Sequence, residues 1–506
     1  MDDNMPMLLS ASLCLALAQA ASTTNIFGPA AWSQYGGNPQ HTALSKYASK
    51  PLQRVLWSTP VDLNPQYSGN DLLIHYGSPV ITAAGTIVVP VKTGVTDGFA
   101  FKGFSPAGTL LWTVATDYTL PPHSWTPSCA GTLELGNYFM VMPAAGGTLL
   151  FRTMPDNVSG VVTRNAFYGT SLYNNATATY NANVKICTPL MGSPNGYMYF
   201  GFRTLGATSA NLKSGIARQR PFVSGGNWIS ASSAAGDAGI SGPVMNCTPA
   251  LSNDGKYVYV AVNSGDFGYG YLLCLDSTTL QTVGKVRLKD PNGNDALLPD
   301  AGTASPMVGP DGDVYFGVLE SPFPYNHDRG WMLHFNATLN IQKPTGAFGW
   351  DDTASIIPAA SVPSYTGASP YLLLTKYNNY AGVGGNGHNM VGILDPNTTQ
   401  VDPITGRAIM REVLTVLGVT PDSGFPGSPG AVREWCINTA AIDPYNKCAV
   451  VNSEDGICYR WNFVTNTLDR AVVLTPGIGE AYTPTVIGPN GNSYAINNGI
   501  LFVLGQ

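Results

Sequence analysis

The chain has 506 residues, of which only 11% are charged, and its formal net charge is −6. This mild acidity excludes the basic surface that nucleic-acid binding requires, and the sequence has no basic run that would favour a membrane surface. Its 57 glycines, 38 prolines, 25 tyrosines and 18 phenylalanines, without sustained helical periodicity, predict many short strands joined by turns.

The first predicted element is a secretory signal peptide at residues 1–20. Residues 7–20 read MLLSASLCLALAQA, an apolar stretch too short to span a bilayer, and they end in a small-x-small pattern, Ala18-Gln19-Ala20. The acidic start MDDN is atypical of such signals. We expect cleavage near Ala20 and export of one domain, residues 21–506, to the periplasm or the extracellular space. No transmembrane segment is predicted.

A repeat fills the rest of the chain. It consists of Ser/Thr-Pro, an apolar strand, a Gly/Asn/Asp turn and a strand rich in Tyr and Val, as in TPALSNDGKYVYVAVN. Five clear copies and three weaker ones begin at Ser78, Thr126, Thr188, Thr248, Ser305, Ile357, Thr439 and Thr483. Each unit has room for four antiparallel strands, and radial repetition of eight units predicts an all-β, eight-bladed β-propeller.

The last repeat lacks a fourth strand. After Thr483 the chain supplies three strands and then ends at Gln506, whereas VLWSTPVD at 55–62 is similar to LLWTVATD at 110–117. We therefore expect the N-terminal segment 30–62 to complete the eighth blade and close the ring, which would remove an exposed sheet edge.

The repeat resembles that of a known family. WSQYGGNPQHTALS from Trp32, the Ser/Thr-Pro to Asp-Gly-x-Val-Tyr strand pairs and LLCLDSTTLQTVGKV at 272–286 are similar to the pyrroloquinoline-quinone (PQQ)-like propeller repeat. The resemblance implies an eight-bladed fold, and either a quinone-dependent alcohol dehydrogenase or a non-catalytic assembly protein. The chain has no adjacent Cys-Cys pair and loses the Gly-Lys-Trp register of the enzymes' docking repeat. We therefore predict no cofactor, with PQQ and calcium as the alternative.

Short motifs predict one disulfide and no metal site. Cys448 and Cys458 flank a turn, so a disulfide across a hairpin is expected, and two buried thiols are an equal alternative. The six histidines form no i,i+2 or i,i+4 pair, and therefore no local zinc site is predicted.

The candidate site follows from the position of each repeat. The segment that leads into each blade and the loop after its second strand should open on one mouth of the central channel, where charged and aromatic residues are typical of a ligand site. Long insertions at 320–331 and 377–389 favour the same mouth. The candidate catalytic residues are His123, Asp351, Asp352, Lys376, Arg433, Glu434 and Glu480. The candidate substrate-binding residues are His75, Tyr76, Lys92, Trp125, Arg203, Glu320, Trp350, Tyr377, Trp435 and Tyr482.

These residues favour a secreted propeller that acts on a small polar or carbohydrate-like substrate by cofactor-free acid–base chemistry. A carboxylate would take a proton while Lys376 or Arg433 stabilises the resulting anion. Two alternatives stay open, a non-catalytic binding or assembly module with a protein partner, and a PQQ-dependent oxidoreductase. For each single residue, the competing interpretation is a structural ion pair between neighbouring blades.

Overall fold

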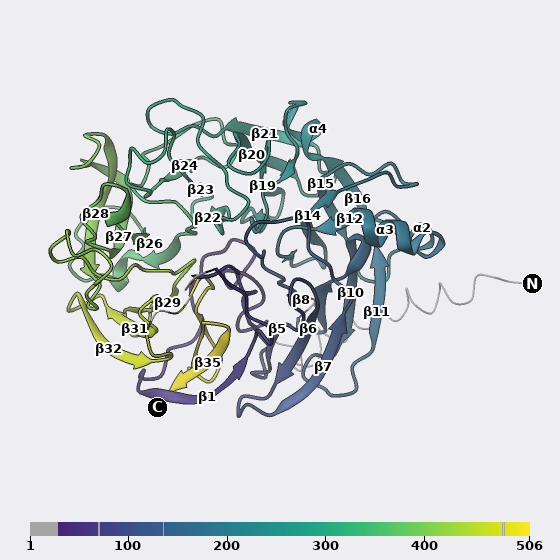
Figure 1. The fold of residues 1–506 in the computed structure, drawn as a ribbon, viewed down its shortest axis with the longest axis horizontal. Helices are drawn as coiled ribbons and strands as arrows, with labels where there is room; N and C mark the ends of the chain where they lie inside the picture. The colour runs from purple at the N-terminus through teal and green to yellow at the C-terminus, as the bar shows by residue number, and fades with distance from the viewer. Residues whose placement is uncertain (1–28, 69–70, 135, 478, 480) are drawn as a thin grey trace, which may run out of the picture.

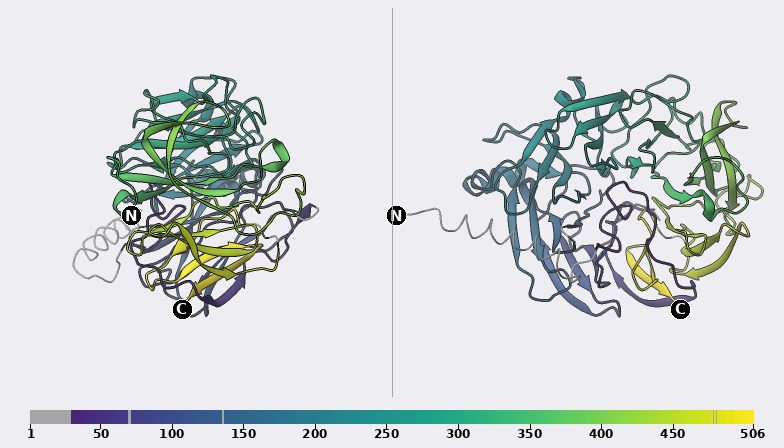
Figure 2. Two further views of the ribbon diagram at one scale, coloured as in Figure 1. Left: turned by 90° about the vertical axis from the view of Figure 1, so that its left-hand side faces the viewer. Right: turned by 180° about the vertical axis from the view of Figure 1, so that it is seen from behind.

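Antiparallel sheets surround a central axis like the blades of a propeller (Figure 1). The computed structural model describes residues 29–506 except 69–70, 135, 478 and 480, so the predicted signal peptide lies outside the described residues. Eight blades are present in this part of the chain, which confirms the predicted eight-bladed β-propeller. Figure 2 shows the same ring from the side and from behind.

The first four blades follow one another along the chain. Blade one contains β4 (Val80–Ile81), β5 (Ile87–Lys92), β6 (Phe99–Phe104) and β7 (Leu110–Thr116). Blade two contains β8 (Thr132–Glu134), β9 (Phe139–Pro143), β10 (Thr148–Thr153) and β11 (Val162–Ala166). Blade three contains β12 (Val184–Ile186), β13 (Met191–Gly192), β14 (Met198–Thr204), β15 (Gly215–Gln219) and β16 (Asn227–Ser230). Blade four contains β17 (Gly242–Pro243), β18 (Ala250–Leu251), β19 (Tyr257–Asn263), β20 (Gly270–Asp276) and β21 (Thr282–Arg287).

The remaining four blades complete the circle. Blade five contains β22 (Met307–Val308), β23 (Val314–Val318) and β24 (Trp331–Phe335). Blade six contains β25 (Ser355–Pro358), β26 (Tyr371–Tyr377), β27 (Met390–Val401) and β28 (Ala408–Leu417). Blade seven contains β29 (Ala441–Asp443), β30 (Cys448–Asn452), β31 (Ile457–Asn462) and β32 (Thr467–Val473). Blade eight contains β33 (Val486–Ile487), β34 (Ser493–Asn497), β35 (Ile500–Gly505) and β1 (Arg54–Pro60).

Few other elements occur in the described residues. A two-stranded sheet joins β2 (Tyr67–Ser68) and β3 (Asp71–Leu72). The short helices are α2 (Thr170–Asn175), α3 (Thr177–Asn183), α4 (Ala231–Ala235) and three 3-10 turns, Ala145–Gly147, Ala359–Ser361 and Ala381–Val383. None of the helices in this part of the chain is long and apolar enough to cross a membrane.

The fifth blade departs from the predicted four strands. Its fourth position is taken by residues 341–346, which make only isolated bridges to β24, Phe335 with Gln342 and Met332 with Gly346. Pro344 lies in this stretch, and because proline has no N–H, it cannot complete a regular ladder.

The predicted closure of the ring is confirmed. β1 pairs antiparallel with β35 from Arg54 opposite Gly505 to Pro60 opposite Ile500, so the two ends of the chain share the eighth blade. Trp57 of β1 also donates its indole N–H to the Pro106 carbonyl at 3.1 Å, which links the eighth blade to the first.

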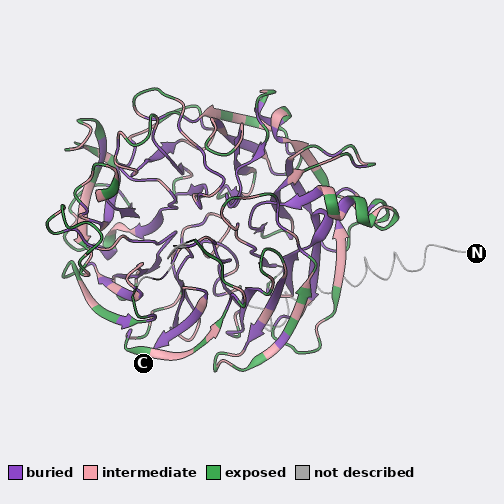
Figure 3. Cartoon of the chain, in the orientation of Figure 1, coloured by how far each residue is buried: buried purple, intermediate pink, exposed green. Residues whose placement is uncertain are grey.

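Burial increases from the rim of the propeller toward its axis (Figure 3). The inner strands β4 and β5 are buried throughout, whereas in the outer strand β7 every residue except Trp112 is exposed or partly buried. Phe101, Met140 and Phe200, from blades one to three, belong to one apolar cluster, so the core lies between neighbouring sheets.

The segment 32–45, which we call the axial segment, ties the inner strands together. It makes at least one hydrogen bond to the inner strand of each of seven successive blades, at Ile81, Leu133, Gly192, Leu251, Val308, Ile356 and Ile442. At six of these residues the bonds include its backbone, and at Gly192 the bond uses the Gln34 side chain. Because the contacts follow the order of the blades, the segment circles the axis and joins neighbouring blades to one strip of chain.

The predicted disulfide is absent. Cys448 and Cys458 are free, buried thiols, as the alternative interpretation expected. Cys448 pairs with Asn462 and Cys458 with Asn452, so the two cysteines stand four residues apart along the hairpin rather than opposite each other. At about 3.3 Å per residue this offset exceeds the Cα separation that a disulfide spans.

Candidate functional site

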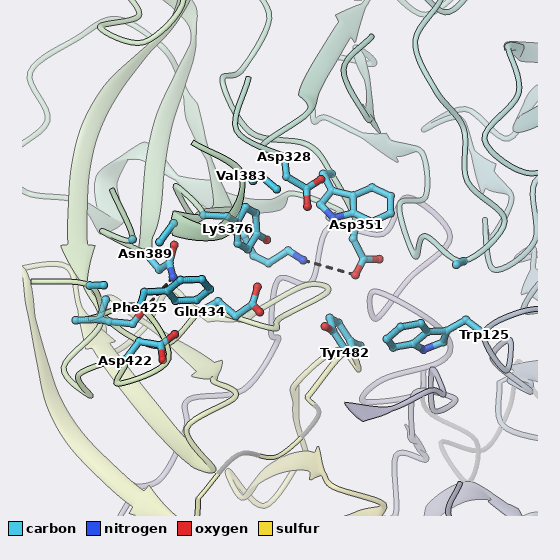
Figure 4. Close-up of a pocket in the computed structure, with 18 of the residues that line it drawn as sticks. Trp125, Asp328, Asp351, Lys376, Val383, Asn389, Asp422, Phe425, Glu434 and Tyr482 are labelled. Carbon is cyan, nitrogen blue, oxygen red and sulfur yellow. Dashed lines mark hydrogen bonds and ion pairs between the residues drawn. The ribbon is translucent and has the colours of Figure 1, made fainter. Parts of the chain in front are cut away.

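A pocket of about 440 Å³ opens at one mouth of the channel (Figure 4). Its side chains come mainly from the loops of blades five to seven, with contributions from the segments that lead into blades one, two and eight. Seven of the residues that we predicted from the sequence line it, namely His75, Trp125, Trp350, Asp351, Lys376, Glu434 and Tyr482. The pocket therefore lies where the repeat positions converge.

The centre of the pocket is an ion pair between Asp351 and Lys376. Lys376, near the end of β26, places its Nζ 3.7 Å from Asp351 Oδ2, and Figure 4 shows the two side chains pointing toward each other. The other carboxylate oxygen, Oδ1, accepts hydrogen bonds from the Thr303 backbone N–H, at 2.5 Å, and from the Thr303 hydroxyl. Asp351 has a left-handed backbone with φ of 52°, so the chain turns sharply here and directs the carboxylate into the pocket.

The neighbouring Asp352 is buried and is not a lining residue. It is 1% exposed, and its Oδ2 has no hydrogen-bond partner in the described part of the chain. Burial raises the pKa of Asp352 well above its ordinary value, although the Lys376 ammonium opposes the change. The adjacent carboxyls thus differ in role, since Asp351 faces the pocket and Asp352 lies in the core.

Asp328 adds a second carboxyl to this side of the pocket. It belongs to the connection between β23 and β24, which Glu320 holds by accepting the backbone N–H groups of Asn326, Asp328 and Gly330. Burial, with a smaller contribution from the Glu320 charge, raises the pKa of Asp328 from 3.8 to about 7. Asp328 therefore exchanges protons near neutral pH, as an acid–base catalyst does.

Three rings form one wall. The His75 ring stacks on Trp125 with centroids 5.5 Å apart, and the edge of Tyr482 meets both rings, at 5.3 and 6.0 Å. His75 Nε2 lies 2.5 Å from the Ala301 carbonyl, so this nitrogen carries the proton and donates it. Burial lowers the pKa of His75, and the ring is therefore neutral at physiological pH.

The opposite wall carries further acidic groups. Asp422 and Glu434 line the pocket, and the Arg433 guanidinium lies behind them, 3.4 Å from Asp422 and 3.5 Å from Glu454. Burial raises the pKa of Glu454. Glu434, Cys436 and Glu454 each offer one ligand atom, all within 4.8 Å of one another, and they are the one described group with a donor set that suits a metal ion.

Three other predicted residues contact carboxylates outside the pocket. Lys92 contacts Asp62 at 3.2 Å and joins the first blade to the eighth, and the Tyr76 hydroxyl donates to the same carboxylate. Arg203 of blade three contacts Asp300, in the connection between blades four and five, at 3.1 Å. For these residues the structural interpretation fits better than substrate contact.

The remaining predicted residues are also outside the lining. The Tyr377 hydroxyl donates to Glu412 at 2.7 Å within blade six, and Trp435 is buried with its indole N–H toward the Asn389 carbonyl at 3.3 Å. His123 Nδ1 lies 2.6 Å from the Pro121 carbonyl. Glu320 is fully buried as the support of its loop, and Glu480 is outside the described residues.

Loop residues that the repeat did not single out also line the pocket. Those with aromatic or polar side chains are Phe267, Asp328, Tyr380, Asn389, Asp422 and Phe425. Most come from the connections after β23, β26 and β28, and a 2.9 Å hydrogen bond between His327 and Asn379 links the first two of these loops. Unusual loop length was the one sequence signal that pointed to them.

The fold and the pocket together define an eight-bladed β-propeller with a ligand-sized pocket at its axial mouth. No protein-family model and no curated protein matches the sequence. Among solved structures, a europium-containing methanol dehydrogenase aligns with a TM-score of 0.54 and 8% identity over 92% of this chain and 89% of its own. The quinohemoprotein alcohol dehydrogenase of Comamonas testosteroni aligns with a TM-score of 0.54 and 11% identity over 94% of this chain and 81% of its own. These similarities show that the chain shares the propeller fold of these two structures.

The lining does not match PQQ itself. PQQ is a planar quinone with three carboxyl groups, so a fitting site must balance their negative charge. Here four carboxyls and one lysine face the pocket. No two of the chain's cysteines are adjacent, as the enzymes' disulfide requires. We therefore derive no step through a quinone.

Proposed function

We propose that the mouth pocket binds a small polar, carbohydrate-like substrate and transforms it by acid–base chemistry that needs no cofactor. The observation that carries the proposal is the Asp351–Lys376 ion pair, 3.7 Å long, set in a pocket with aromatic walls. Polar rings pack their apolar faces against aromatic side chains while charged groups bind their hydroxyls, so this combination suits such a substrate.

Each polar group has a role in the proposed reaction. Asp351 accepts a proton from a substrate C–H or O–H group, and Lys376 stabilises the negative charge that this leaves on the substrate. Asp328, with a pKa of about 7, returns a proton to another atom of the substrate. One proton is taken and one is given, so the net charge of the protein does not change. Asp351 then releases its proton to water and Asp328 takes one up, which restores the starting protonation states.

A binding module without turnover is the second candidate. The loops after β23 and β26 are longer than the fold requires, and they build the rim of the pocket. Long loops on a rigid scaffold serve recognition as readily as catalysis. In this case the same lining would hold a ligand, and no bond would change. For either candidate we further propose export of the mature chain, on the strength of residues 1–20.

One experiment tests the proposal and separates the two candidates. A panel of sugars, sugar acids and polyols is titrated by calorimetry against the wild type, Lys376→Met and the control Lys256→Met, which alters an exposed turn. We expect binding that Lys376→Met weakens at least about tenfold and the control leaves unchanged. The bound compound is then incubated in heavy water. Deuterium bound to a carbon of the ligand supports proton transfer, binding without carbon-bound deuterium or product favours the module, and no binding to the panel refutes both.

A quinone control completes the test. The protein is mixed with PQQ and calcium, and the absorbance of protein-bound quinone is measured after gel filtration. We expect no bound quinone, and retention of PQQ would favour the oxidoreductase instead.

A further inference from the structure

Charge is distributed unevenly in the pocket. The lining contains four carboxyls, Asp328, Asp351, Asp422 and Glu434, but one ammonium group, that of Lys376. Lys376 lies against Asp351, and the Arg433 guanidinium behind the wall lies 3.4 Å from Asp422. Counting both cations, the site still has more acidic than basic groups.

Asp328 is the carboxyl most open to a new partner. Its side chain makes no hydrogen bond or ion pair with any residue in the part of the chain that the structure describes. The connection that carries it is held firmly, because Glu320 accepts three of its backbone N–H groups and the buried ion pair of Arg329 with Asp402, 2.8 Å long, anchors the next residue. The carboxyl is therefore fixed in position and available to a ligand.

Aromatic side chains share the pocket with these acids. Trp125, Trp350, Tyr380, Phe425 and Tyr482 all line it. Lys376 Nζ already lies 5.9 Å from the centroid of the Tyr482 ring, so these rings can receive a positive charge at their faces. A divalent metal ion would need converging oxygen ligands and gains little from rings, whereas an organic ammonium is stabilised by both carboxylates and aromatic faces.

We propose that the ligand of the mouth pocket carries an ammonium group that pairs with Asp328, and that amino sugars and related amines are its class. This inference rests on the proposed function and specifies the substrate. A ligand with one positive charge offsets part of the surplus of acidic groups in the pocket, whereas an anionic ligand such as a sugar acid would add another negative charge. Asp328 ionises when it pairs with the ammonium, so for an amine ligand the ammonium takes over the role of proton donor that Asp328 has for a neutral substrate, while Lys376 remains with Asp351.

The test compares similar ligands with and without a positive charge. Glucosamine, glucose and N-acetylglucosamine are titrated at pH 6.5, where the glucosamine amine is protonated, and benzylamine and benzyl alcohol serve as a second matched pair. We expect each amine to bind at least about tenfold tighter than its neutral counterpart. Asp328→Asn should remove most of this preference and keep the weak binding of the neutral compounds. The control Asp276→Asn, at the end of β20, should keep the preference.

Each outcome separates the inference from the proposed function. Equal binding of amines and neutral compounds refutes the ammonium inference and leaves a polar-ligand pocket intact. The inference is also refuted if the amines fail to bind while a neutral sugar or polyol of the larger panel binds. Loss of amine binding with a chelator would mean that the acids hold a metal ion instead. Failure of every compound to bind refutes both proposals.

Discussion

Asp328 should make the stability of the protein fall as the pH rises. Its pKa is about 7 in the folded chain and 3.8 as the ordinary value. Below pH 4 both states hold the proton and the group contributes nothing. Between pH 4 and pH 7 the unfolded chain loses the proton first, so the folded state is progressively disfavoured. A difference of about three pKa units, at 1.36 kcal/mol each, is at most about 4 kcal/mol, because a half-buried carboxyl keeps some water.

Asp328→Asn tests this magnitude, because the amide resembles the protonated acid at every pH. We measure unfolding by guanidinium chloride at intervals from pH 4 to pH 8 for both proteins. The variant should gain stability relative to the wild type as the pH rises, reaching up to about 4 kcal/mol at pH 8. In the control Asp469→Asn the difference should stay nearly constant from pH 4 to pH 8, because burial is outweighed by the hydrogen bonds from Arg460 and Asn462, the pKa of Asp469 lies below 3.8, and the carboxyl is therefore already ionised in both states. If the free energies of unfolding of Asp328→Asn and the wild type differ by the same amount at every pH, the reasoning is refuted.

Three further predictions follow from the site and the fold. Asp351→Asn should weaken binding of the best compound from the ligand panel. Asp352→Asn should not, because the buried Asp352 does not reach the pocket, and calorimetry with both variants checks this. Tyr35→Phe should cost about 1–3 kcal/mol in denaturant unfolding, because it leaves buried partners of the hydroxyl unsatisfied. A reducing agent should leave the Tm unchanged, because Cys448 and Cys458 are free thiols, and a drop of several degrees would contradict the register of blade seven.

The architecture was predictable because each blade repeats the same local pattern. Ser/Thr-Pro precedes the buried inner strands, as at Ser78 before β4 and Thr483 before β33, and the following Tyr/Val-rich segment forms the second strand. The missing fourth strand of the last copy was enough to place β1. The fourth strand of blade five was not predictable from the repeat, because one proline at 344 interrupts the pairing without changing the overall pattern.

The site was predictable in part, for a physical reason. Residues just before an inner strand, such as His75 and Asp351, are fixed at the mouth by the strand that follows them. Residues at the end of a second strand differ according to their neighbours, because Lys376 reaches the pocket, whereas Lys92 and Arg203 pair with carboxylates from other parts of the ring. Whether such a residue faces the pocket or forms a structural ion pair depends on where the partner carboxylate lies. The spacing of residues within one repeat does not predict that position.

Closure of the ring and construction of the site are coupled through Thr303. The Tyr35 hydroxyl of the axial segment lies 3.4 Å from the Thr303 carbonyl, and Asn438 donates to the same oxygen at 3.1 Å. The N–H and hydroxyl of Thr303 in turn hold Asp351. The axial segment and Asn438 therefore help to hold the residue that positions the carboxylate, so a chain with an open ring should bind the ligand more weakly even where its individual sheets persist.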